Sequence, residues 1–320
     1  MSIISKDITK AIDILTNEDV VAIPTETVYG LAGNIYSEKA IRKIFSVKQR
    51  PLFNPLIAHV ASIESAEALA AEFPEKARKL AEAFWPGSLT LLLKKKATVP
   101  DLITAGKDTV AVRIPNHPVT LELLKNLPFP LAAPSANPFG SISPTTAQHV
   151  ENYFKDAIAM VLEGGPCQNG IESTIVGFED NKPVIYRLGS ISIEEIIEVI
   201  GDVTLKNKKE VAPNAPGMLS RHYAPNTKLY LVDDVADFIK EHPTKKIGVI
   251  RFSNGLTAPN VTHLEILSES GNLKEAAAKL YTTLHQLDTL YLDMIVAEKF
   301  PDTGLGTSIN DRLERATKRK

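Results

Sequence analysis

The first two hundred residues alternate between helical and strand-like spacing of their hydrophobic positions. Apolar residues recur at helical spacing over 8–15 and 39–47, and each stretch predicts an amphipathic helix. Short apolar runs bounded by proline, glycine or polar residues predict strands between the helices. The predicted strands are 20–23, 56–60, 89–93, 109–114, 157–162, 174–178 and 184–188. Strands that alternate with helices in this way indicate an α/β fold.

A change of composition divides the chain after about residue 205. Ser192 and Glu195 form a capping box for a helix that ends near residue 200, and the following segment is polar, rich in lysine and broken by prolines. Beyond this segment the pattern predicts a compact βαβ-type unit. Its predicted strands are 228–232, 247–252, 263–267 and 294–297, and its predicted helices are 234–241, 273–287 and 309–316. We therefore expect a first domain at 1–205, a linker at 206–227 and a smaller domain at 228–320.

Composition and charge narrow the class of protein. A chain of 320 residues is long enough for two domains, and 44% hydrophobic with 23% charged residues is ordinary globular composition. The net charge of −2 argues against a protein held on nucleic acid by a broad basic field. The single Cys167 excludes an internal disulfide. Without a long apolar run or a signal peptide, we expect no membrane association and a cytoplasmic location.

Several common catalytic motifs are absent from the sequence. The chain contains no GxxxxGK[ST] phosphate-binding loop, no HExxH zinc motif and no GxSxG nucleophile elbow. The nearest approach to a phosphate-binding loop, at 165–170, continues into Ile171 and Glu172 instead of Lys and Ser or Thr. We therefore expect chemistry that uses neither a resident metal ion nor a covalent nucleophile.

Two cations near the end of the second predicted helix are candidate ligands for a polyphosphate. Lys48 and Arg50 stand two residues apart before Pro51, so an extended segment would project both to the same side. Asn54 lies just beyond them. A solvated helix end, where basic residues interact favourably with the helix dipole, would explain the same two cations.

Charged side chains also interrupt three predicted strands. Arg113 lies among apolar neighbours, which is costly unless its guanidinium meets a bound anion or an internal carboxylate, and the sequence leaves both open. His59 lies opposite the apolar positions of its strand, where it could bind a ligand or be a hydrogen-bonded structural residue. Arg187 lies in a third strand. Together with Lys48 and Arg50, the two arginines suggest convergence on a ligand with several negative charges.

Small polar side chains lie beside two strands, a short buried strand at the start of LAAPSANPFGSISPT and the predicted strand at 174–178. The segment LAAPSANPFGSISPT places Ser135, Asn137 and Ser143 beyond one strand, and Ser173 begins another. Ser143 before a proline predicts a helix N-cap, and the free amides of such a helix start can also bind phosphate. In the linker, Tyr223 and its neighbours could close over a ligand as a lid, or the linker could be a connector stiffened by proline.

These segments together resemble a known family. The segments that carry the resemblance are PTETVYGL, KQRPLFNPL, FWPGSLT, VAVRIPNHP, APSANPFGSISPT, ESTIV and YRLG. In this order they resemble the YrdC-type domain, and PGMLSRHYAP with the C-terminal part resembles the long, two-domain form of the threonylcarbamoyl-AMP synthase family. The resemblance covers essentially the whole chain. It implies a twisted, open mixed-sheet YrdC-type domain followed by a smaller Rossmann-like α/β domain.

The resemblance also implies a reaction and a set of site residues. In the reaction, a nucleotidyl transfer, L-threonine, bicarbonate and ATP carrying Mg²⁺ give threonylcarbamoyl-AMP and pyrophosphate, and a separate transferase complex then forms threonylcarbamoyladenosine in tRNA. The residues implied around threonine are Thr27, His59, Arg113, Ala133 and Ser173. Those implied around ATP are Lys48, Arg50, Asn54, Thr109, Ser135, Asn137, Ser143, Arg187 and Tyr223. The implied catalytic residues are Lys48, Arg50 and Arg113.

Two other functions remain open at this point. A module that binds double-stranded RNA on a concave basic face would need no catalysis, but the near-neutral charge and 6% aromatic content leave at most weak RNA binding. A carbamoyl transferase that uses carbamoyl phosphate would need similar arginines. These functions differ in the small molecules that they consume.

Overall fold

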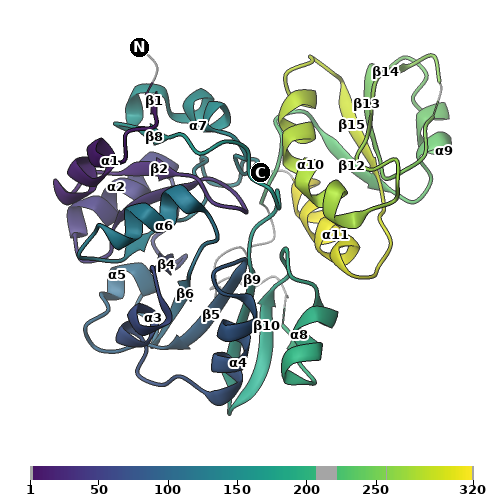
Figure 1. Ribbon diagram of the computed structural model, residues 1–320. Helices are drawn as coiled ribbons and strands as arrows, with labels where there is room; N and C mark the ends of the chain where they lie inside the picture. Colours follow the sequence, from purple (N-terminus) through teal and green to yellow (C-terminus); the bar gives the residue numbers. More distant parts are fainter. Residues whose placement is uncertain (1–2, 207–221, 257, 319–320) are drawn as a thin grey trace.

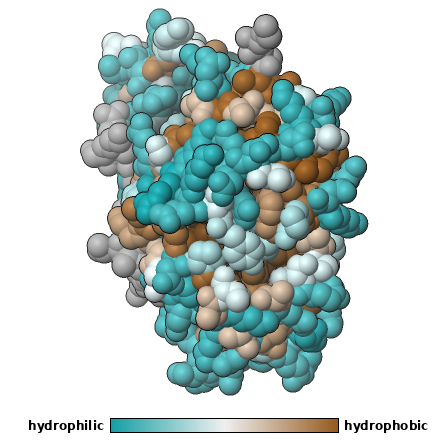
Figure 2. All heavy atoms as spheres, turned by 90° about the vertical axis from the view of Figure 1, so that its left-hand side faces the viewer, coloured by the Kyte–Doolittle hydropathy of each residue, from teal (hydrophilic) through white to brown (hydrophobic). Residues whose placement is uncertain are grey.

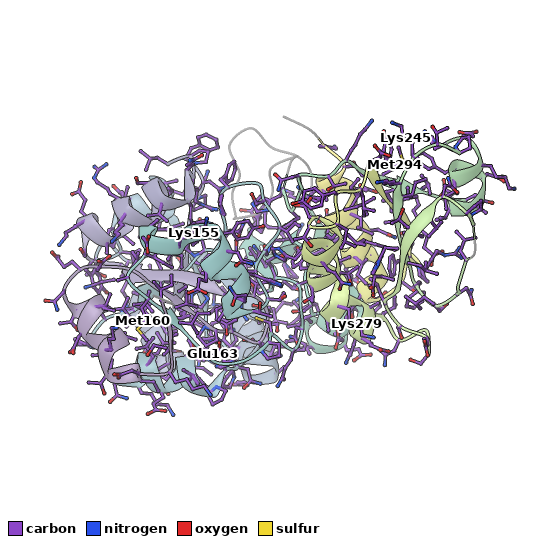
Figure 3. The ribbon with its side chains drawn as sticks, turned by 90° about the horizontal axis from the view of Figure 1, so that it is seen from above. Lys155, Met160, Glu163, Lys245, Lys279 and Met294 are labelled. Carbon is purple, nitrogen blue, oxygen red and sulfur yellow. The ribbon has the colours of Figure 1, made fainter. Side chains whose placement is uncertain are left out.

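The chain folds into two α/β bodies that lie side by side (Figure 1). The computed structural model describes residues 3–206, 222–256 and 258–318. Seen from above, Met160 and Glu163 lie in the first body, and Lys279 and Met294 lie in the second (Figure 3). Most of the predicted linker, 206–227, lies outside the described residues. Only Lys206 and residues 222–227 of this linker are described.

The first body is built on an eleven-stranded mixed sheet. Its strands are β1 (Ile4–Ser5), β2 (Val21–Ile23), β3 (Gly30–Asn34), β4 (Ile57–His59), β5 (Leu89–Lys94), β6 (Thr109–Arg113), β7 (Leu131–Ala132), β8 (Val161–Leu162), β9 (Thr174–Glu179), β10 (Lys182–Arg187) and β11 (Thr204–Leu205). The spatial order is β1-β8-β2-β3-β7-β4-β6-β5-β9-β10-β11. The sheet contains both parallel pairs, such as β4 with β6, and antiparallel pairs, such as β5 with β6, which confirms the expected mixed sheet.

Helices cover this sheet and enclose its core. They are α1 (Ile8–Thr16), α2 (Glu38–Lys48), α3 (Ile63–Leu69), α4 (Glu75–Phe84), α5 (Asp101–Thr104), α6 (Pro118–Lys125), α7 (Ala147–Phe154), the 3₁₀ turn η1 (Lys155–Ala157) and α8 (Ile193–Ile200). One apolar cluster packs α2, α4, α7 and α8 against the sheet, and a second packs α1 and α6. The capping box of Ser192 and Glu195 is confirmed at the start of α8.

Two local predictions for this body are wrong. Ser143 is not a helix cap: α7 begins four residues later, and Thr146 caps it by accepting the backbone N–H of His149. The carbonyl of Pro144 accepts the N–H of Tyr29 at 2.9 Å, so this segment is held to the loop after β2 instead of starting a helix. The strand predicted at 157–162 is limited to β8, because its first residue ends the turn η1.

Strand β3 was missed because its sequence, GLAGN, contains two glycines and little strand preference. Packing explains both glycines. A Cβ at Gly30 would approach the Cβ of Ala133 to 3.1 Å, and a Cβ at Gly33 would approach the side chain of Ile44 to the same distance. The strand therefore forms where helix α2 and the loop after β7 come close to its backbone. The strand propensity of its residues does not predict this close packing.

The second body is a parallel sheet of four strands flanked by three helices. Its strands are β12 (Leu229–Val232), β13 (Ile247–Arg251), β14 (Val261–Ile266) and β15 (Met294–Glu298), in the order β12-β15-β13-β14. Its helices are α9 (Val235–Lys240), α10 (Leu273–Leu287) and α11 (Leu305–Ala316). Helices α10 and α11 lie on the side of this sheet that faces the first body, and α9 lies on the far side (Figure 1). The expected Rossmann-like α/β unit is thus confirmed.

Polar and apolar side chains are interspersed on the outer face of the first body (Figure 2). Single apolar side chains at a protein surface are ordinary and need no partner to explain them. Within the described ranges, the helices include none with the length and hydrophobicity of a membrane span.

Buried polar contacts join the two bodies. Arg312 on α11 forms an ion pair of 2.8 Å with Glu172, and the side chains of the two residues are 1% and 7% exposed. The hydroxyl of Tyr281 on α10 donates to the same carboxylate at 3.0 Å. At the edge of the interface, the rings of His149 on α7 and His285 on α10 stack with centroids 3.9 Å apart. The interface thus depends on specific polar contacts as well as on apolar packing.

The stacked imidazoles predict a stability that depends on pH. Burial lowers the pKa of His149 to about 3 and that of His285 to about 4, whereas an unfolded chain returns both to about 6.5. Below pH 6.5 the unfolded state therefore binds more protons, and stability falls as the pH falls toward these folded values. Between pH 7 and pH 5 we expect a loss on the order of 1 to 2 kcal/mol for each ring, since both are partly exposed.

Denaturant unfolding at pH 7 and pH 5 measures this loss. Replacing both rings by His149→Gln and His285→Gln should reduce the difference in unfolding free energy between the two pH values. His263→Gln is the control, because His263 lies on β14, an edge strand of the second sheet, and pairs with Glu265 instead of stacking on a second imidazole. The explanation fails if the double variant keeps the full pH dependence of the wild type.

Candidate active site

A cavity lies in the first body where strands β4, β6 and β10 end. Because β4 and β6 are parallel and in register, their last residues, His59 and Arg113, lie side by side. The wall includes nine of the residues that the sequence analysis selected: Thr27, Arg50, His59, Arg113, Ala133, Ser135, Ser173, Arg187 and Tyr223. His222 and Tyr223 also line this cavity, whose volume is about 50 Å³. Distant segments therefore meet at one site.

Two guanidiniums of the wall are held in place by neighbouring carbonyl groups. Arg50 donates from Nε to the carbonyl of Asn54 at 3.2 Å and from Nη2 to the carbonyl of Pro55 at 2.8 Å. Arg187 donates from Nε to the carbonyl of Ser173 at 3.0 Å and from Nη2 to its hydroxyl at 2.9 Å. Burial, followed by the nearby charge of Arg187, lowers the pKa of Arg50 to about 9. Like charges buried together would be stabilised by an anionic ligand.

Arg113 meets an internal carboxylate and also faces the cavity. Its Nη2 lies 2.7 Å from Oε1 of Glu26, its Nη1 donates to the hydroxyl of Thr27 at 2.9 Å, and its Nε donates to the carbonyl of Gly87 at 3.1 Å. The sequence analysis had left an anion and an internal partner as alternatives. Burial, followed by the charge of Arg113, lowers the pKa of neighbouring His59 to about 3, so this imidazole is neutral near pH 7.

Lys48 lies behind the wall and not in it. Helix α2 continues through Lys48, and Gln49 ends it in the left-handed conformation with φ 52°, so the expected extended segment does not form. The expected alternative of a solvated helix end is also wrong, because Lys48 is only 1% exposed. Its Nζ donates to the carbonyls of Ser135 and Asn137. Lys48 therefore anchors the loop that places Ser135 in the wall.

Four further predicted residues lie outside the wall: Asn54, Thr109, Asn137 and Ser143. Asn54 is fully buried, and neither its Oδ1 nor its Nδ2 has a hydrogen-bond partner among the residues described. A buried amide with both ends unsatisfied is rare in folded proteins and marks a place where a ligand or a rearrangement would supply partners. Thr109, at the start of β6, lines a different hollow beside Lys94 and Asp180. The structure does not bring Thr109 to the cavity.

The sequence analysis did not select Glu172, His222, Tyr281 or Arg312 as site residues. Burial by itself would raise the pKa of Glu172, but Arg312, Arg187 and a 2.6 Å hydrogen bond from Ser143 keep it below its ordinary value. One signal was available in α11. Arg312 falls three residues after Ile309 on the apolar face of a helical pattern, and an arginine on such a face needs a buried partner.

Residues of the second body support the cover of the cavity. The guanidinium of Arg312 lies 5.0 Å from the ring centre of Tyr223. The ring of Tyr281 stacks on the ring of Tyr223, with centroids 5.6 Å apart. His222 is buried beside Tyr223, with ring centres 4.3 Å apart. Across the described ranges, three or more His, Cys, Asp or Glu side chains nowhere gather in a way that could hold a metal ion. The linker residues His222 and Tyr223 are therefore held in place by an aromatic and a cationic group of the second body.

Comparisons with known proteins agree with this architecture. The family described as telomere recombination matches residues 13–189, and the family described as the C-terminal domain of threonylcarbamoyl-AMP synthase matches residues 191–317. The curated threonylcarbamoyl-AMP synthase of Pyrococcus abyssi is 41% identical over 312 residues, which cover 93% of this chain and 90% of its own. That of Bacillus subtilis is 40% identical and covers 97% and 92%.

A solved structure agrees with the observed fold over nearly the whole chain. The crystal structure of P. abyssi Sua5 complexed with L-threonine matches with a TM-score of 0.90 at 39% identity, covering 97% of this chain and 94% of that chain. Both domain types, their order and the fold are thus shared with these relatives. The chain belongs to the threonylcarbamoyl-AMP synthase family.

Proposed function

We propose that the protein forms threonylcarbamoyl-AMP and pyrophosphate from L-threonine, bicarbonate and ATP. The observation that carries this proposal is the convergence of three buried guanidiniums, those of Arg50, Arg113 and Arg187, on one cavity. Fixed cations shielded from water suit substrates with several negative charges, here a triphosphate and a carboxylate. The names of the relatives at about 40% identity support the same reaction.

The amino-acid side of the site would be formed around Arg113. Its guanidinium would bind the carboxylate of threonine, with Thr27, His59, Ala133 and Ser173 around the substrate. Threonine's amine combines with carbon dioxide from bicarbonate by forming an N–C bond, and the amine loses a proton to solvent or buffer. The resulting carbamate is transient, and a pocket that holds it beside ATP raises its effective concentration at the reacting phosphorus. No covalent bond to the protein is required.

The nucleotide side of the site would be formed by Arg50 and Arg187. A carbamate oxygen attacks the α-phosphorus, an O–P bond forms, and the bond to the β-phosphate oxygen breaks to release pyrophosphate. The two guanidiniums would stabilise negative charge that builds on the phosphates, and Mg²⁺ would arrive as part of the ATP substrate. Lys48 would act indirectly through the loop containing Ser135 and Asn137, and the unsatisfied amide of Asn54 would gain a partner.

The cover would open and close during turnover. His222 and Tyr223 line the cavity, so a movement of this segment would change the access of ATP to the site. With the cover closed, water is excluded from a labile mixed anhydride. We assign catalysis to a domain at 1–205, the cover to a linker at 206–227 and its support to a domain at 228–320. The product would pass to a separate complex that modifies tRNA.

Pyrophosphate release measured with single substrates omitted tests this proposal. We expect release only when ATP, threonine and bicarbonate are all present, and mass spectrometry should detect threonylcarbamoyl-AMP. An RNA-binding module would release no pyrophosphate under any of these conditions. A carbamoyl transferase would require carbamoyl phosphate in place of bicarbonate. Either result would overturn the proposal.

A further inference from the structure

Two buried carboxylates lie close to the cationic wall, and they have different surroundings. Glu172 accepts hydrogen bonds from Ser143, Tyr281 and Arg312. Glu26, in the loop after β2, is 5% exposed and forms its ion pair with Arg113. Its Oε1 also lies 3.4 Å from the hydroxyl of Ser88, whereas its buried Oε2 has no hydrogen-bond partner among the described residues. Glu172 lines the cavity itself, whereas Glu26 lies behind the wall, beside Arg113.

The contacts of Arg113 fix the plane of its guanidinium. Its Nε donates to Gly87 and its Nη1 to Thr27, while its Nη2 lies 2.7 Å from Oε1 of Glu26 as an ion pair without an aligned hydrogen bond. A guanidinium has five N–H groups in one plane, so groups that fix this plane also fix the direction of its remaining donors. Glu26 thus helps to hold Arg113 in place, and the negative charge of its carboxylate offsets the positive charge of the guanidinium. The pair as a whole is neutral.

A neutral pair has a consequence for the substrate. An α-amino acid carries a carboxylate and an ammonium only two bonds apart, and an ammonium is repelled by the positive potential of Arg50, Arg187 and Lys48. A carboxylate beside Arg113 lowers that potential locally while leaving the guanidinium available to the substrate's carboxylate. A simple anion would bind more tightly to an arginine without a neighbouring carboxylate. A zwitterion would bind more tightly to the pair of Arg113 and Glu26.

We propose that Glu26 is a positioning and specificity-determining residue that makes the amino-acid site select a zwitterion over a simple carboxylate. It acts through Arg113, by orienting the guanidinium, and through its own charge, by making room for the α-ammonium. This inference rests on the proposed function, because it takes Arg113 as the group that binds the carboxylate of threonine. It adds a residue that the sequence analysis did not select.

The test compares threonine with 3-hydroxybutyrate, which keeps the carboxylate and the β-hydroxyl but lacks the ammonium. In Glu26→Gln, which keeps the shape and removes the charge, we expect the KM for threonine to rise at least tenfold. Inhibition by 3-hydroxybutyrate should become tighter, and the KM for ATP should stay within twofold. Glu26→Asp keeps the charge and should retain the preference for threonine. Glu179→Gln, a carboxylate at the surface end of β9, is the control and should change none of these values.

Several results would overturn the inference. If Glu26 has only a structural role, Glu26→Gln will weaken the binding of threonine and of 3-hydroxybutyrate by the same factor, or will raise the KM for ATP as much as the KM for threonine. If Glu26→Gln does not fold, the affinities of the wild-type protein still test the inference. 3-Hydroxybutyrate must then bind at least tenfold more weakly than threonine, and equal affinities would contradict the inference. If pyrophosphate release does not depend on threonine at all, the proposed function itself fails. Release that depends on threonine but is insensitive to Glu26→Gln removes this inference alone.

Discussion

Arg113→Ala is expected to lower kcat/KM for threonine-dependent pyrophosphate release by about 30- to 1000-fold. This range corresponds to a loss of about 2 to 4 kcal/mol in transition-state stabilisation, as found when one preorganised donor to a developing anion is removed. The reason is geometric, because Arg113 combines a wall position with three contacts that fix its guanidinium. Steady-state kinetics with threonine as the varied substrate measures the effect.

Two further variants separate catalysis from folding. Alanine at position 113 leaves Glu26 buried without its ion-pair partner, so thermal unfolding must be followed alongside activity. Arg113→Lys keeps a positive charge beside Glu26 but loses the planar fork, and it should fold well while remaining at least tenfold impaired. Arg251→Ala is the matched control: Arg251 also ends a strand and pairs with a glutamate, Glu298, but in the second body. Wild-type kinetics in both position-113 variants would refute the assignment.

Arg312→Met is expected to destabilise the protein by about 3 to 5 kcal/mol, although Arg312 lies outside the cavity wall. Removing one member of a buried ion pair leaves the other charge uncompensated, and that charge accounts for most of the cost. Here Glu172 would keep only the hydroxyl donors Ser143 and Tyr281 and the more distant charge of Arg187. Denaturant unfolding, followed separately for each body, measures the change.

A double-mutant cycle gives the sharper result for this pair. Combining Arg312→Met with Glu172→Gln removes both charges, and we expect the double variant to recover most of the stability that the single variant loses. Lys279→Met is the control, since the pair of Lys279 with Glu275 on α10 is exposed to solvent and its loss should change stability little. Additive losses in the double variant would show that the two residues do not act as a pair.

Sequence reasoning succeeded where periodicity alone places a side chain. His59 and Arg113 were predicted opposite the apolar faces of two strands, and the parallel register of those strands then brings them together. It failed where a single backbone conformation decides the outcome. Helix α2 continues through Lys48 and buries its side chain before Gln49 ends the helix, and Thr146 caps α7 in place of Ser143. Such choices depend on contacts that a local pattern does not contain.

Partners far apart in the sequence were the hardest to predict. Glu172 and Arg312 are separated by 140 positions, and the sequence around either residue does not identify the other as its partner. The charge pattern of α11 does indicate that Arg312 needs a buried partner, but only the fold identifies that partner as Glu172. The same holds for Glu26 and Arg113, which lie on different segments of the first body. For such pairs, sequence predicts the need for a contact and structure supplies its identity.

The long separation of Glu172 and Arg312 also matters while the chain is being synthesised. A ribosome adds about 5 to 20 residues per second, so the 140 positions between the two residues require on the order of 10 seconds. During that interval the nascent first body contains a carboxylate whose cationic partner has not yet been translated. The wall around Glu172 therefore cannot reach its final state until α11 has been synthesised and has docked.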